Sequence, residues 1–132
     1  MTGRDKASSV GGFPLTPKHG HLLREIVYSA RLILTRSEDQ SDAGYLDNAA
    51  LRAIVERKVE IIGEDLIRLR DDDRELFGRV DGADRVIGLR NLIAYDDEDY
   101  PRERLWRETV ALLPALLASV ERLLVAAGRP DP

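Results

Sequence analysis

The spacing of the apolar residues constrains this chain most, because they recur at intervals of three and four in three long segments. Such spacing lines one face of an α-helix, whereas a half-buried strand would need apolar side chains at every second position. The first segment carries Leu22, Leu23, Ile26, Val27, Ala30, Ile33 and Leu34. The second carries Leu51, Ile54, Val55, Val59, Ile62, Leu66 and Leu69. The third carries Leu105, Trp106, Thr109, Leu112, Leu113, Leu116, Leu117, Val120, Leu123 and Leu124. We therefore predict an all-α protein, built as an antiparallel bundle of four or five helices with short connections.

Residues that favour helix ends lie at the borders of these segments. Thr16 and Pro17 predict the start of the first helix, since a hydroxyl can cap it and proline suits its first turn. The polar stretch 37–42 is interpreted as the loop that ends this helix. Asp47 or Asn48 is expected to cap the second helix.

The second half of the chain is expected to form a helix over about residues 81–94 and another that begins after Pro101. Pro114 lies inside the last segment, and proline lacks the N–H that a helix interior needs, so we predict a kink or a break near it. Gly63 and Gly88 fall inside helical segments, where glycine costs about 1 kcal/mol relative to alanine. Both glycines therefore predict close packing against another helix.

Length suits a single domain with one core. We interpret residues 1–15, which lack periodicity, as a flexible N-terminal tail and residues 16–128 as the helical bundle. Cysteine is absent, and His19 and His21 are the only histidines. This composition excludes thiolate sites and does not favour a histidine-bound zinc, so no metal and no cofactor are expected.

No apolar run approaches the roughly 20 residues of a membrane span, and the N-terminus lacks the apolar region of a signal peptide. We therefore expect a cytoplasmic protein without a membrane partner. The net charge of −4 opposes nucleic-acid binding except at a local basic patch.

Three stretches carry the most specific patterns. Residues 53–64 read AIVERKVEIIGE, residues 87–94 read IGLRNLIA, and Trp106 is followed by a Leu-Pro pair within residues 106–116. Together they resemble the HEPN superfamily, and within it the HepT-like toxins of bacterial and archaeal toxin–antitoxin pairs. The similarity covers about residues 20–124, with matching order and spacing.

The resemblance implies a four-helix bundle that forms a homodimer and cleaves RNA as a metal-independent endoribonuclease. Two copies of the family's motif face each other across the dimer cleft. The implied partner is an MntA-like minimal nucleotidyltransferase, an antitoxin that binds the toxin and in some pairs adds AMP to a motif tyrosine.

The family's motif consists of arginine, a polar residue, three further residues, histidine, one residue and tyrosine. Arg90 and Asn91 match its first half, whereas Tyr95 occupies the histidine position and Asp97 the tyrosine position. The resemblance thus makes Arg90, Asn91 and Tyr95 the candidate catalytic residues. It also makes Tyr95 and Tyr100 the candidate sites of AMP addition.

Metal-free RNA cleavage needs a base for the 2′-hydroxyl proton, an acid for the leaving oxygen and a cation beside the phosphate. Arg90 suits the cation role because its planar fork matches phosphate oxygens. A phenol with a pKa near 10 is a poor base at neutral pH, so Tyr95 in place of histidine predicts a rate loss of roughly 10²–10⁴. The four acids at 96–99 would also repel a phosphate backbone.

Less specific interpretations remain open beside these. Arg90 can be an ion-paired surface residue, Tyr95 an amphipathic residue packed by its ring at a helix end, and Trp106 a core anchor. Glu60 and Glu64 are expected to pair with Lys58 or Arg68 on the helix surface. For the whole chain, the alternatives to a weakened ribonuclease are a catalytically inactive HEPN dimer that binds the nucleotidyltransferase, and a purely structural helical dimer.

Overall fold

The structure is a computed structural model that describes residues 15–96 and 98–128. Within these ranges every regular element is a helix, and the prediction of an all-α protein is confirmed. The elements are α2 (Pro17–Ser37), α3 (Asp42–Asp47), α4 (Ala49–Asp72), α5 (Arg74–Phe77), α6 (Ala83–Ala94) and α7 (Arg102–Gly128). Residues 1–14 of the proposed tail lie outside the described residues, and Leu15, assigned to that tail, packs partly buried against the core.

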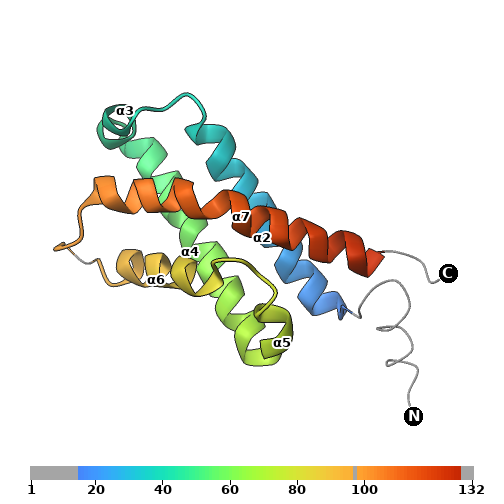
Figure 1. Cartoon of the computed structure of the whole chain (residues 1–132). Coiled ribbons are helices and arrows are strands. Elements are labelled where there is room, and N and C mark those ends of the chain that lie inside the picture. Colours follow the sequence, from blue (N-terminus) through green and yellow to red (C-terminus); the bar gives the residue numbers. More distant parts are fainter. Residues whose placement is uncertain (1–14, 97, 129–132) are drawn as a thin grey trace, which may run out of the picture.

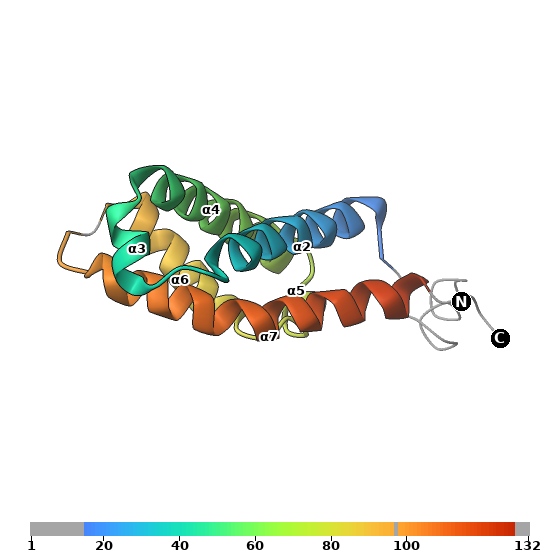
Figure 2. The ribbon, with the colours of Figure 1, turned by 90° about the horizontal axis from the view of Figure 1, so that it is seen from above.

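The four longer helices pack so that α2 and α6 each contact both α4 and α7 (Figures 1 and 2). Polar contacts fix the helix directions. Lys18 in the first turn of α2 pairs with Asp72 in the last turn of α4 at 2.6 Å, so these two helices are antiparallel. Asp81, just before α6, lies 3.5 Å from Arg122 near the end of α7, which gives the same relation for that pair.

Apolar side chains from all these helices form one core. Tyr45 of α3 and Trp106 of α7 stack in it with ring centroids 3.9 Å apart and planes 11° apart. Trp106 is only 3% exposed, so its interpretation as a core anchor is confirmed. Burial raises the pKa of Tyr45 to about 12, with a smaller contribution from the nearby Glu56 carboxylate. The phenol therefore stays neutral inside the core.

Local capping explains where the helices begin. The Thr16 hydroxyl accepts a hydrogen bond from the His19 amide at 3.0 Å, and the Asn48 side chain accepts one from the Leu51 amide at 2.9 Å. Each bond satisfies an amide that has no partner within its helix. The predicted start of α2 is thus confirmed, and of the two expected caps of α4 it is Asn48 that acts.

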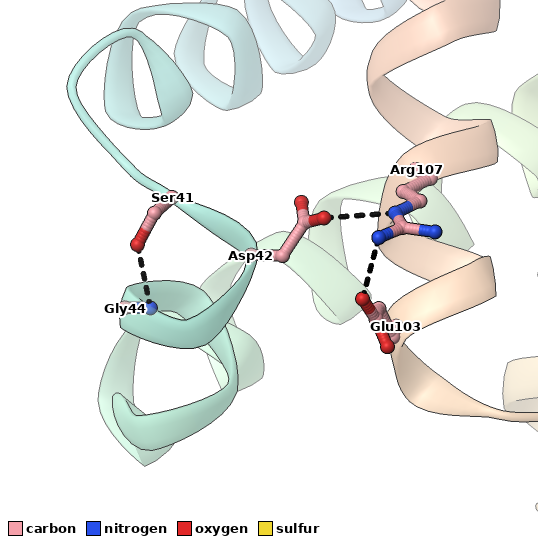
Figure 3. Close-up of polar contacts among 5 residues, drawn as sticks. All are labelled: Ser41, Asp42, Gly44, Glu103 and Arg107. Carbon is pink, nitrogen blue, oxygen red and sulfur yellow. Dashed lines mark hydrogen bonds and ion pairs between the residues drawn. The ribbon is translucent and has the colours of Figure 1, made fainter.

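The polar stretch after α2 is shorter than predicted, because α3 begins at Asp42. The Ser41 hydroxyl accepts a hydrogen bond from the Gly44 amide at 3.0 Å and so starts this helix (Figure 3). Arg107 of α7 donates through Nε to the Asp42 carboxylate at 2.8 Å and through Nη2 to Glu103 at 2.6 Å. These contacts fasten α3 to the first turns of α7.

The break predicted near Pro114 does not occur, because α7 continues through this residue from Arg102 to Gly128. Pro114 is exposed, so the carbonyl that lacks an amide partner lies toward water rather than in the core. The helix expected from residue 81 begins instead at Ala83, since Gly82 has a left-handed backbone with φ of 73° that cannot be part of a helix.

By length and composition, α7 is the one described helix that qualifies to cross a membrane, with a mean hydropathy of 1.9 over 18 residues. The expectation that no segment qualifies was therefore too strict. Core helices of globular proteins meet the same criteria, and one face of α7 packs into this core. Only 28% of that window is buried, but Val125 is the one large apolar side chain in the described part of α7 that is exposed, at 59%.

Candidate functional site at the contact of α4 and α6

Arg90 lies where α6 packs most closely on α4, directly over Gly63. A Cβ atom added at Gly63 would lie 2.4 Å from Cβ and 2.5 Å from Cγ of Arg90. Real side chains do not approach so closely, so only glycine admits the arginine stem here. The prediction of close packing is confirmed for Gly63. It is wrong for Gly88, where an added Cβ would meet nothing within 4 Å.

The guanidinium of Arg90 makes a hydrogen bond through Nη1 but none through Nε or Nη2 with the described residues. Its side chain is 23% exposed. Nη1 donates a hydrogen bond to the Asn91 side-chain oxygen at 2.9 Å, and Nε is buried without a hydrogen-bond partner. Arginine carries five N–H donors. The Nη2 group therefore keeps donors for an anion or a rearranged neighbour, whereas Nε becomes accessible only if the groups that cover it move.

Among the described residues, Glu64 provides the carboxylate that pairs with this guanidinium, with Oε2 4.0 Å from Nη2 of Arg90. The sequence predicts that Glu64 pairs with Lys58 or Arg68, and that prediction is wrong. Arg68 instead lies 3.6 Å from Asp65, and Lys58 lies over the Tyr28 ring at 5.2 Å. The helix spacing allowed these pairs, but the approach of α6 gives Glu64 a different neighbour.

Tyr95 is not brought to Arg90. It follows the last residue of α6, and its backbone amide donates to the Asn91 carbonyl at 3.0 Å. Its side chain is exposed, at 77%, so the ring does not pack as one interpretation expected. The next residue, Asp96, has a positive φ of 50°, which turns the chain away from the helix. Asp97, at the family's tyrosine position, lies outside the described residues.

Tyr100 has a more enclosed environment than Tyr95. Its hydroxyl donates to the Glu108 carboxylate, and the Arg104 guanidinium lies 5.1 Å from its ring centre. Tyr100 also lines a cavity of about 390 Å³ that holds the carboxylates of Glu56 and Asp96. Arg102 pairs with Glu56 at 2.5 Å there. An acidic cavity with its cation already paired does not suit a phosphate ligand.

Both histidines lie on α2. His19 lies in the first turn of α2, where Nε2 is 3.5 Å from the Asp72 carboxylate. The hydrogen bond and charge of Lys18 lower the pKa of Asp72, with a smaller contribution from His19. His21 is exposed on the same helix. No group of three or more metal-binding side chains occurs in the described part of the chain.

Two features escaped the sequence analysis. Asp65 is 1% exposed, and its Oδ2 has no hydrogen-bond partner. Burial, followed by a hydrogen bond with Glu25, raises the pKa of Asp65 to about 8. A signal existed, because Asp65 lies three residues after Ile62 and four before Leu69, on the apolar face. The second feature is a groove of about 590 Å³ between α2 and α7, where Tyr28 and Val125 are exposed.

No protein-family model, no curated protein and no solved structure matches this chain. The geometry around Arg90 is therefore the observation from which a function can be inferred. That geometry offers a cation with spare donors, an amide that orients it and an acid at its edge. Such an arrangement can bind a phosphate through the free donors of the guanidinium.

Proposed function

We propose that this chain is a HEPN-like four-helix bundle of the HepT type that acts on RNA as a cytoplasmic homodimer. Arg90 binds a phosphate of the RNA backbone, and Asn91 orients Arg90. The observation that carries this proposal is the guanidinium above Gly63, which is partly exposed and makes one hydrogen bond with the described residues, to Asn91. Neither a metal nor a cofactor takes part.

Cleavage in this proposal is slow. The 2′-hydroxyl attacks the adjacent phosphorus and gives its proton to water, and the bond from phosphorus to the 5′-oxygen breaks, while Arg90 balances the charge that accumulates on the phosphate oxygens. The phenol of Tyr95 can give a proton to the leaving oxygen, but a phenol is a poor proton acceptor at neutral pH. Because Tyr95 is exposed at the end of α6, its ring is free to reach a phosphate held by the second copy of a homodimer.

The test compares Arg90→Ala with Arg85→Ala, an exposed arginine earlier on the same helix. Labelled RNA is incubated with each purified protein, and both binding and cleavage are measured. Arg90→Ala should weaken binding at least tenfold and remove any cleavage, while Arg85→Ala should change either by less than threefold. Equal binding and cleavage in the wild type and Arg90→Ala would refute the proposal.

A separate gain-of-function experiment tests the role of the replaced histidine. Tyr95→His should raise the cleavage rate by roughly 10²–10⁴, the usual contribution of general acid–base catalysis. The matched control is Tyr95→Phe, which keeps the ring and removes its hydroxyl. A rate unchanged by Tyr95→His would mean that residue 95 takes no part in proton transfer.

The exposure of Tyr95 favours a second candidate function, a binding module for a minimal nucleotidyltransferase. A freely accessible tyrosine hydroxyl is suited to receive AMP, whereas the hydroxyl of Tyr100 is already bonded to Glu108. Co-expression with a nucleotidyltransferase encoded next to this protein, followed by mass spectrometry, tests this function. One AMP should appear on the wild type and on Tyr100→Phe, and none on Tyr95→Phe.

A further inference from the structure

We propose that Glu64 regulates the candidate site as a built-in competitor that limits the affinity of Arg90 for phosphate. This inference rests on the proposed function, in which Arg90 is the group that binds phosphate. Glu64 lies outside the motif of Arg90, Asn91 and Tyr95, and its role is to oppose phosphate binding. An incoming phosphate must then replace the carboxylate beside the guanidinium.

The backbone of α4 places this carboxylate. Gly63 has no side chain, so α6 closes on α4 until the stem of Arg90 lies against the Gly63 backbone. Glu64 is the next residue along α4, and its carboxylate reaches to 4.0 Å from Nη2 of Arg90. The same glycine that admits the arginine thus brings an acid to its edge.

The unused donors of Arg90 lie where a carboxylate would bind. Nε and Nη2 share one edge of the planar guanidinium, the edge that forms paired hydrogen bonds with carboxylates and phosphates. Nε is buried without a partner, and Nη2 faces Glu64. A shift of roughly 1 Å would bring Glu64 to the usual length of a charge-assisted hydrogen bond. Glu64 and a phosphate therefore compete for the same donors.

No other described acid occupies this position. Asp65, the next residue, is buried and lies 3.6 Å from Arg68. The Glu64 side chain is 37% exposed, so it can move aside into water when an anion arrives. Because both charged groups are partly exposed, solvent screens their attraction, and its removal should tighten phosphate binding by about 3- to 10-fold.

The experiment compares Glu64→Gln with Glu60→Gln, a partly buried glutamate one turn earlier on α4. Glutamine keeps the size of the side chain and removes its charge. The nitrogen-15-labelled full-length protein is titrated with inorganic phosphate at constant ionic strength while the Nε–H resonance of Arg90 is followed, and Arg90→Lys assigns that resonance. RNA binding is measured in parallel, and thermal unfolding confirms that each variant is folded.

Glu64→Gln should bind phosphate about 3- to 10-fold more tightly than the wild type, and Glu60→Gln should stay within twofold. An affinity that is unchanged or weaker in Glu64→Gln, or an Arg90 resonance that phosphate does not move in either protein, would overturn the inference. If RNA binding depends on Arg90 but not on Glu64, the inference falls and the proposed function stands. If Glu64→Gln tightens phosphate binding while RNA binding ignores Arg90, the proposed function falls and the inference stands.

Discussion

The contact between Gly63 and Arg90 predicts opposite effects of alanine at two helical glycines. In Gly63→Ala the new Cβ would lie 2.4 Å from Cβ and 2.5 Å from Cγ of Arg90. Carbon atoms pack best at about 3.5–4.0 Å, so the helices must separate by about 1 Å at this point. The Cβ of Arg90 is fixed to the backbone of α6, so a change of rotamer cannot relieve the clash.

The expected loss can be assembled from two opposing terms. Overpacking of a tight contact typically costs 1–3 kcal/mol. Alanine in place of a helical glycine returns about 0.5–1 kcal/mol. We therefore expect Gly63→Ala to lower the free energy of unfolding by about 1–2 kcal/mol, which for a chain of this size corresponds to a fall in Tm of roughly 3–10 °C.

Gly88→Ala is the matched control, because an added Cβ at Gly88 meets nothing within 4 Å. Only the helix-propensity term applies there, so this variant should gain about 0.5–1 kcal/mol. Urea unfolding followed by circular dichroism and by the fluorescence of Trp106 measures both changes. If Gly63→Ala is as stable as the wild type, or if both variants shift in the same direction, the proposed packing of α6 on α4 is wrong.

Asp65→Asn should stabilise the protein by about 2–4 kcal/mol at pH 7, and urea unfolding at several pH values would measure it. Because burial raises the pKa of Asp65 to about 8, the wild type should lose stability as the pH rises from about 4 to 8, whereas the variant should not; a parallel pH dependence would contradict this. Trp106→Ala should lower the free energy of unfolding by about 3–5 kcal/mol, since it removes the ring stacked on Tyr45. A decrease in Tm of less than about 5 °C in thermal unfolding would contradict this. Ser41→Ala should lower the free energy of unfolding by about 0.5–2 kcal/mol, because it removes the cap of α3, and thermal unfolding would measure the loss. Ser37→Ala keeps that cap and tests whether the loss is specific.

Much of the fold could be predicted because helix periodicity and capping are local. Thr16 and Asn48 cap the amides that their sequence positions suggest, and the apolar positions of Ile62 and Leu66 are fully buried. The hydrogen bonds of a cap join residues three apart, so no knowledge of the tertiary structure is needed. The short helix α3 was missed because its start at Ser41 lies in a stretch that is polar throughout.

The candidate site could be predicted only in part, because it depends on which helices meet. Gly63 and Gly88 look alike in the sequence, yet only Gly63 faces a neighbouring helix. Arg90 and Asn91 are adjacent, and their hydrogen bond is local. The contact of Glu64 with Arg90 joins residues 26 positions apart, so helix spacing alone favoured nearer partners and gave the wrong pair.

Pro114 lies on the exposed face of α7, whereas Leu113 and Leu116 lie on its buried face. Proline has no amide hydrogen, so the carbonyl of Val110 lacks the hydrogen bond that residue 114 of a helix normally donates. The ring of Pro114 is exposed. Water must therefore complete the hydrogen bonding of this turn from outside. In hydrogen–deuterium exchange, the backbone amides on this outer side should exchange faster than the amides beside Leu113 and Leu116. Two exchange rates should therefore occur within one uninterrupted helix.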